Sequence, residues 1–390
     1  MKGIAAVILA IILLFCSCDT MPKAEQKNRE NLVAVWITYY ELAAFAKSEE
    51  GFEKAICLAL DKCKSIGVNT VFVHTRAFCD AIYDSEIFPR ATSMVSVEGD
   101  PLEIIIKAAR QRGISVHAWI NPYRVSSSST DINSLPQNSP ARIWRADENV
   151  NNDINVCITD NGIYLNPAEK DVQVLVLKGV RELLDNYDID GIHIDDYFYP
   201  TANVEFDEVS YSNYKQNLTL PLDLAEWRRQ NVSGLVKAIY CAVKAKDTNL
   251  LFGVSPAADI DRCYNSLYAD VEAWLDGEYI DYMMPQLYFG FEYPIEKFTF
   301  DSLLTLWLDM AGDRKADLYV GLGNYKTGTA SKPDSVEWSA NTDIIARQIQ
   351  RLYENNVKGF AFFSYSSLFG EEDLQKKQTE NIVKKLKEIK

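Results

Sequence analysis

Positive charge is scarce in this chain. Its 390 residues include 40 Lys and Arg against 55 Asp and Glu, which gives a formal net charge of −15. A surface of that sign repels nucleic acid phosphates and anionic membrane surfaces, so no nucleic acid partner is expected. The composition, with 47% hydrophobic and 24% charged residues, is otherwise that of a globular protein with a large core.

Motifs that would indicate several other classes of protein are also missing. No glycine-rich phosphate loop opens a first helix, no Gly-x-Ser-x-Gly turn suggests a serine hydrolase, and the cysteines lack metal-type spacing. The only histidines, His74, His117 and His193, fall on neighbouring predicted strands but at different heights. We therefore predict no metal site and no cofactor.

Only the N-terminus has an apolar run with the features of an export signal. Lys2 precedes this run, which is too short for a comfortable membrane span. Residues 1–18 are predicted to be a lipoprotein-type signal peptide, because Cys18 after the small Ser17 resembles a bacterial lipobox; plain secretion is the alternative. Polar residues 19–31 are predicted to be a flexible tether. The expected protein is extracytoplasmic and contacts the membrane only through an N-terminal lipid anchor.

From residue 32 onward, apolar runs rich in β-branched residues alternate with stretches of helical period. This α/β pattern predicts a (β/α)8 TIM barrel over residues 32–390, with a doubly wound open sheet as the alternative. The predicted strands begin at Leu32, Asn69, Ile114, Asp190, Leu250, Tyr279, Leu318 and Gly359. The predicted helices span 51–66, 101–112, 169–187, 222–247, 264–276, 298–312, 342–355 and 372–388.

The connections after predicted strands three, four and seven are unusually long. The first runs from Asn121 to about Tyr164, the second from Asp195 to about Pro221, and the third contains NYKTGTASKPDSVEW. Long loops usually have a function or are disordered. In a barrel they lie on the face that holds the active site, so we expect these loops to shape it.

The fourth predicted strand ends in a pair of aspartates, in the segment GIHIDDYFYP. Alternation places Gly191, His193 and Asp195 on the inner face, with Asp195 at the end where a barrel presents catalytic groups. Asp195 and Asp196 cannot both ionise cheaply beside apolar neighbours, so one pKa should rise. We predict that both are catalytic, with an aspartate pair that stabilises a loop or binds calcium as the alternative.

Other strand ends supply aromatic rings, amides, an arginine and hydroxyl groups, which suit a sugar because rings stack on its CH faces and polar groups bind its hydroxyls. The predicted substrate-binding residues are Arg76, Asp80, Tyr83, Trp119, Asn121, Tyr123, Arg124, His193, Tyr197, Gln286, Tyr288 and Tyr365. Of these, His193 is expected beneath the site, where it would hydrogen-bond a catalytic carboxylate. The predicted partner is therefore a glycan.

Several motifs together resemble the glycosyl-hydrolase-like family ten, barrel proteins of the bacterial cell envelope that are frequently lipoproteins. They are AVWITYYE, RAFCDAIYDS, AWINPYR, YLNPAEKDV, DGIHIDDYFYP, IDYMMPQLY and GFAFFSYSSL. The resemblance implies cleavage of glycosidic bonds in a cell-envelope glycan, namely peptidoglycan strands with N-acetylated sugars. A looser similarity to the DGxDxDxE signature of chitinase-type barrels puts Tyr197 where the acid glutamate belongs.

The general acid must then come from elsewhere. Asp195 is expected to be the nucleophile or electrostatic stabiliser, and Asp196 is the nearest candidate acid if the chain turns inward after the strand. Glu205, Asp259 and Glu292 are the reserves. The substrate's own acetamido group could instead be the nucleophile. A non-catalytic glycan-binding lipoprotein and a metal-dependent carbohydrate deacetylase remain the alternatives to a hydrolase.

Overall fold

The structure is a computed structural model that describes residues 31–389 except 217 and 330–334. The predicted signal peptide 1–18, its lipidation site Cys18 and all but the last residue of the predicted tether 19–31 lie outside the described residues. Those expectations stay predictions. Within the part that is described, no helix is both long and apolar enough to cross a membrane.

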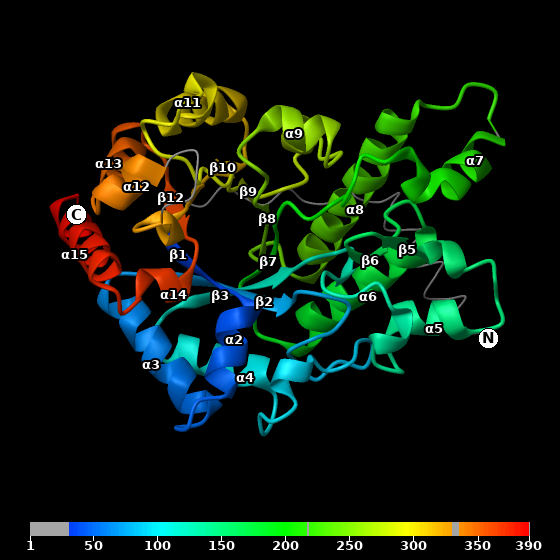
Figure 1. Ribbon diagram of the computed structural model, residues 1–390, viewed down its shortest axis with the longest axis horizontal. Helices are drawn as coiled ribbons and strands as arrows, with labels where there is room; N and C mark the ends of the chain where they lie inside the picture. The colour runs from blue at the N-terminus through cyan, green and yellow to red at the C-terminus, as the bar shows by residue number, and fades with distance from the viewer. Residues whose placement is uncertain (1–30, 217, 330–334, 390) are drawn as a thin grey trace.

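Parallel strands form a barrel at the centre of the molecule, as predicted (Figure 1). In spatial order they are β10 (Asp317–Leu318), β9 (Tyr282–Met283), β8 (Leu251–Val254), β7 (Gly191–Ile194), β3 (Ser115–Ile120), β2 (Thr70–Arg76), β1 (Leu32–Ile37), β12 (Gly359–Phe362) and β11 (Val320–Leu322). Only Tyr319 separates β10 from β11, so a single stretch of chain pairs with both β9 and β12. The two edges of the sheet therefore meet, and the (β/α)8 architecture is confirmed.

Helices surround the barrel on its outer side (Figure 1). They include α3 (Phe52–Ser65), α4 (Pro101–Arg110), α6 (Lys170–Asn186), α8 (Leu224–Lys246), α11 (Phe300–Ala311), α13 (Ile344–Glu354) and α15 (Asp373–Glu388). The predicted helix 264–276 is instead two short helices, α9 (Ile260–Asn265) and α10 (Val271–Asp276). Tyr268 between them has a φ of 54°, which a helix cannot accommodate, and Asp270 caps the second helix.

Each of the three long connections contains structure of its own. After β3 comes a small antiparallel sheet of β4 (Arg124–Ser126), β6 (Gly162–Leu165) and β5 (Val156–Thr159), together with α5 (Pro140–Ala146). After β7 comes α7 (Glu208–Gln216), and after β11 comes α12 (Ser335–Ala340). Two short helices that the sequence pattern did not predict, α2 (Tyr39–Ala46) and α14 (Tyr365–Leu368), follow β1 and β12.

The inside of the barrel is a hydrophobic core separate from the one between strands and helices. It consists of Leu32, Ala34, Trp36, Phe72, Trp119, Tyr282, Met284, Tyr319 and Ala361. Glycines make room for the large rings: a Cβ on Gly253 would lie 2.0 Å from the ring of Tyr282, and one on Gly321 would lie 3.0 Å from Trp36. The barrel is thus filled largely by aromatic rings, and Gly253 and Gly321 provide the space that two of these rings occupy.

A chain of hydrogen bonds crosses this interior. The indole nitrogen of Trp36 donates to Nε2 of His193 at 3.2 Å, and the hydroxyl of Tyr282 lies 3.0 Å from Nδ1 of both His193 and His117. Since Nε2 of His193 accepts, its Nδ1 holds the proton and donates to Tyr282. Burial lowers the pKa of His193 well below the usual imidazole value, so this residue is neutral.

A buried ion pair fixes the long connection after β7. Arg228 on α8 donates to both carboxylate oxygens of Asp207, to the backbone carbonyls of Ala202 and Asn203, and to the hydroxyl of Tyr268. Both side chains of the pair are fully buried. Removal of either partner would leave a charge without compensation in the interior, so the chain around residue 205 is firmly held.

Replacement of Gly253 by alanine should destabilise the protein, because the new methyl group would collide with the ring of Tyr282. We expect a loss of about 1–3 kcal/mol in the free energy of unfolding, measured by urea denaturation. Gly234 in α8 is the matched control, since nothing lies within 4 Å of its Cβ position. Gly234→Ala should be neutral or stabilise by up to about 1 kcal/mol. Equal effects of the two changes would contradict the packing described for the barrel interior.

Candidate active site

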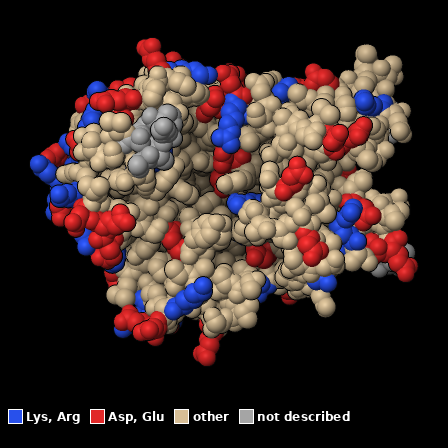
Figure 2. All heavy atoms as spheres, in the orientation of Figure 1, with Lys and Arg blue, Asp and Glu red and all other residues tan. Residues whose placement is uncertain are grey.

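A cavity of about 560 Å³ opens at the carboxyl ends of the barrel strands. Figure 2 shows this face of the molecule hollowed near its centre, with acidic and basic side chains spread around the rim. The residues that line the cavity include Trp36, Tyr39, Tyr40, Glu41, His74, Trp119, Arg124, Asp195, Asp196, Tyr197, Ser255, Arg262, Gln286, Tyr288, Tyr325, Phe363 and Ser364. Rings, carboxylates and guanidinium groups thus meet in one cleft.

Asp195 is held in place by donors on several sides. It receives hydrogen bonds from the indole of Trp119 at 3.1 Å and from the backbone N–H of Tyr197 at 3.2 Å. The Asn121 amide, oriented with its nitrogen toward Asp195, lies 2.9 and 3.0 Å from the two carboxylate oxygens. Asp195 accepts all of these hydrogen bonds, which stabilise the ionised form of its carboxylate and fix the orientation of the side chain.

Asp196 lines the same cavity although it follows Asp195 directly. The strand ends at Ile194, and the backbone turns so that the N–H of Phe198 donates to the carbonyl of Asp196 at 3.0 Å. This turn is what brings the Asp196 side chain into the cleft. Its carboxylate accepts one hydrogen bond, from the side-chain amide of Gln286 at 3.2 Å.

The two carboxyl groups titrate together. Burial, followed by the charge of Asp196, raises the pKa of Asp195 well above the usual carboxyl value. Burial also raises the pKa of Asp196, against the effect of Arg262 and Gln286. Because two neighbouring charges in a desolvated site repel, the pair keeps one proton to a higher pH than an isolated aspartate would.

Two arginines stand beside this pair. The guanidinium of Arg124 lies between the rings of Phe78 and Tyr197, 4.9 and 4.4 Å from their centroids. Arg262 lies on α9, a helix that the sequence analysis did not place at the site. Their positive charges favour the ionised form of Asp196.

A third carboxylate in the cleft has a structural role. Glu41 on α2 accepts from the backbone of Thr38 and Ser366 and from the hydroxyl of Ser364. It therefore ties the end of β1 to the turn after β12. The signal that could have revealed this residue is the capping box Thr38-x-x-Glu41 directly after a strand.

The cleft brings together some of the predicted substrate-binding residues and not others. Trp119, Arg124, Tyr197, Gln286 and Tyr288 line it with the two aspartates. Asn121 and His193 lie beneath them, the former against Asp195 and the latter against Trp36 rather than a carboxylate. Arg76, Asp80, Tyr83, Tyr123 and Tyr365 are not among the lining residues.

Arg76 shows why regular side-chain alternation along a strand wrongly placed some of the predicted substrate-binding residues in the cleft. The pairing of β2 with β3 is irregular between His74 and Arg76, so Arg76 turns to the outer side, where its guanidinium lies 4.4 Å from the centroid of Phe88 and close to Gly179 of α6. Tyr83 and Tyr123 are fully buried with hydroxyls that have no partner among the described atoms.

Asp80 and Tyr365 are also absent from the lining of the cleft. Burial raises the pKa of Asp80 to about 6. The ring of Tyr365 packs 5.4 Å from that of Phe45.

The reserve acids do not enter the cleft either. Glu205 lines a separate cavity, Asp259 caps α9, and Glu292 is not among the lining residues. Within the described ranges, no group of three or more His, Cys, Asp or Glu side chains is placed to hold a metal ion. Apart from Glu41, the carboxylates that line the cleft in the described part of the chain are thus Asp195 and Asp196.

A (β/α)8 barrel with a carboxylate pair at the end of one strand, in a cleft lined with aromatic rings, is the architecture of many glycoside hydrolases. The chain belongs to the family described as Glycosyl hydrolase-like 10, whose model matches residues 31–340. This confirms the resemblance found in the sequence motifs.

Two relatives agree with this assignment, and a solved structure agrees with the fold. The chain is 32% identical to the glycosyl hydrolase YngK of Bacillus subtilis, over 94% of this chain and 74% of the relative. It is 26% identical to the glycosyl hydrolase DigH of Escherichia coli, over 97% of this chain and 94% of the relative. The glycoside hydrolase domain of PgaB from Bordetella bronchiseptica shares the fold with a TM-score of 0.61 at 11% identity, over 91% of this chain and 99% of that domain.

Removal of the positive charge of Arg262 should change the pH dependence of turnover. Arg262 lowers the pKa of Asp196, so Arg262→Met should raise that pKa. Asp196 is the predicted general acid, and a general acid works below its pKa, so the loss of kcat/KM on the alkaline side should move to higher pH. The profile is measured from the release of reducing ends across a pH series. Arg110→Met, which removes a surface arginine paired with Asp188, is the control and should leave the profile in place.

Proposed function

We propose that this protein hydrolyses glycosidic bonds in a cell-envelope glycan, in particular peptidoglycan strands with N-acetylated sugars. The observation that supports this most strongly is the Asp195 and Asp196 pair, which lines one aromatic cleft in a chain of the Glycosyl hydrolase-like 10 family. The predicted export signal and lipid anchor at Cys18 would place the protein where such glycans occur.

The two aspartates have different surroundings and therefore different tasks. Asp195 is fixed by three donors, which suits a carboxylate that stabilises positive charge as it develops at the anomeric carbon, or that orients an acetamido nucleophile. Asp196 accepts only from Gln286 and faces the cavity, which suits a group that delivers a proton to the leaving oxygen. Because the pair keeps one proton to a higher pH than an isolated aspartate would, a proton is available for this transfer.

The rings around the pair supply the sugar platform. His74 stacks on Trp119 with ring centroids 3.5 Å apart, which holds the indole so that its N–H reaches Asp195. Tyr288 stacks on Phe363 at 5.5 Å on the other side of the cleft. Rigid rings of this kind bind the CH faces of a pyranose and leave the hydroxyl groups to the polar side chains.

The reaction is tested by incubation of the purified protein with glycan strands stripped of peptide and measurement of new reducing ends. Asp195→Asn and Asp196→Asn should each lower kcat by about a hundredfold to ten-thousandfold, because each removes a group that acts in the transition state. Asp343→Asn is the matched control, since this exposed carboxylate lines a different surface cavity, between α13 and α15.

Each outcome of that experiment is decisive. No new reducing ends with the wild-type protein, together with retained binding to the strands, would favour the glycan-binding lipoprotein. Release of acetate without reducing ends, abolished by a chelator, would favour the deacetylase. Unchanged turnover in Asp195→Asn would remove the basis of the proposed hydrolysis.

A further inference from the structure

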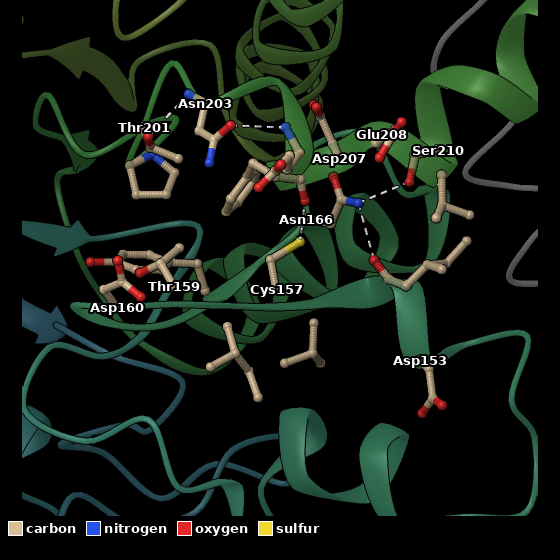
Figure 3. A pocket seen from close by; sticks show the side chains of 18 of the residues that line it. Asp153, Cys157, Thr159, Asp160, Asn166, Thr201, Asn203, Asp207, Glu208 and Ser210 are labelled. Carbon is tan, nitrogen blue, oxygen red and sulfur yellow. Dashed lines mark hydrogen bonds between the residues drawn. The ribbon is translucent and has the colours of Figure 1, made fainter.

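A second cavity lies beside the cleft, on the loops that follow β3 and β7. It has a volume of about 590 Å³ and is walled by the β5–β6 hairpin on one side and residues 200–210 on the other. Figure 3 shows Thr201 and Asn203 across the cavity from Thr159 and Asp160. Nothing in the proposed chemistry at Asp195 uses these residues, so this distal cavity needs an explanation of its own.

A small cavity, here called the passage, lies between the distal cavity and the cleft. The passage has a volume of about 170 Å³, shares Arg124, Asp196, Tyr197 and Arg262 with the cleft, and shares Tyr164 and Pro200 with the distal cavity. Arg124 and Tyr164 are cross-strand partners in the β4–β6 ladder, so the register of this small sheet sets the passage. The three cavities are thus neighbours, each sharing lining residues with the next, and we call the row that runs from Asp196 across the hairpin the groove.

The walls of the distal cavity are held rigidly. Asn166 donates to the hydroxyl of Ser210 at 2.9 Å, and the thiol of Cys157 donates to the carbonyl of Phe206 at 3.2 Å. The Arg228 and Asp207 pair fastens the same 200–210 segment from behind. A groove whose opposite sides are bonded to each other exists before any ligand arrives, so little ordering entropy opposes binding.

The lining of the groove has the chemistry of a carbohydrate site. Tyr197, with 48% of its surface exposed, and Tyr164 offer rings in the passage. Farther along, the carboxylates of Asp160, Glu205 and Glu208 join hydroxyl and amide side chains, and most of these groups accept hydrogen bonds. Sugar hydroxyls and acetamido N–H groups are the matching donors.

From this we infer that the distal cavity binds further units of the same glycan chain whose bond is cleaved between Asp195 and Asp196. The protein then grips several consecutive sugars and acts within chains rather than only at their ends. This inference rests on the proposed function for the identity of the bond that is cleaved, but binding by the groove can be measured without cleavage.

The experiment uses oligosaccharides of N-acetylglucosamine as probes and the Asp195→Asn protein, so that no turnover interferes. Calorimetric titration should show tighter binding of a hexasaccharide than of a disaccharide, because only the longer probe reaches the hairpin. Tyr164→Ala should weaken hexasaccharide binding by about threefold to tenfold, the worth of one stacking contact, and leave disaccharide binding unchanged. Tyr164→Phe should retain the wild-type preference, since it keeps the ring.

Glu205→Trp provides a second variant, because a large side chain at this exposed position would fill the distal cavity. It should abolish the advantage of the hexasaccharide. Asp343→Trp is the matched control, since Asp343 is likewise an exposed acid that lines a different surface cavity, between α13 and α15. Thermal unfolding of each variant shows that it is folded.

The outcomes separate this inference from the proposed hydrolysis. Equal affinity for the two probes, no binding of either, or an equal effect of Glu205→Trp and Asp343→Trp would overturn the role of the distal cavity. If stripped strands yield no reducing ends, the proposed hydrolysis is overturned. If affinity still increases with probe length and Glu205→Trp removes that increase, the groove is established as a glycan site.

Discussion

A closed barrel encloses a space that side chains must fill, and this constraint shapes everything above it. The rings of Trp36, Phe72 and Tyr282 occupy the interior, and Gly321 and Gly253 leave space for the first and the last of them. Because the barrel interior beneath the cleft is tightly packed, it forms a rigid support, here called the floor, for the polar groups at the strand ends. His193 belongs to that floor: its ring is stacked on Phe72, 4.3 Å between centroids, and hydrogen-bonded on both nitrogens, so it supports the site without entering it.

Burial is also what distinguishes the two aspartates from surface carboxylates. An exposed pair would be hydrated and ionised at neutral pH, whereas this pair is desolvated by the floor and by the surrounding rings. The fold compensates for this cost with the donors that converge on Asp195. Desolvation therefore both raises the pKa of the two carboxyl groups and costs free energy on folding.

Sequence patterns were sufficient for the barrel and for the position of the aspartate pair at the mouth of the barrel. Each apolar run became a strand, and Asp195 lies at the end of β7 because side-chain alternation in a short parallel strand leaves few choices. Positions where the backbone is irregular could not be predicted from these sequence patterns. The bulge before Arg76, the turn after Ile194 and the break at Tyr268 depend on tertiary contacts, such as the bond from Arg228 to the Tyr268 hydroxyl, which no local pattern reveals. Arg262 was missed for the same reason, whereas Glu41 had a local signal in its capping box with Thr38.

The bond between Glu41 and Ser364 has a consequence for how the site comes into being. It joins residues 323 positions apart, and it lies where β1 meets β12. Contacts so distant along the chain are the slowest to form. A growing polypeptide therefore possesses its aspartate pair long before it possesses a cleft, and the wall that completes the cleft arrives with the last strand. The cleft can therefore form only when the chain is complete. A product truncated before β12 would contain the Asp195 and Asp196 pair but would lack one wall of the cleft.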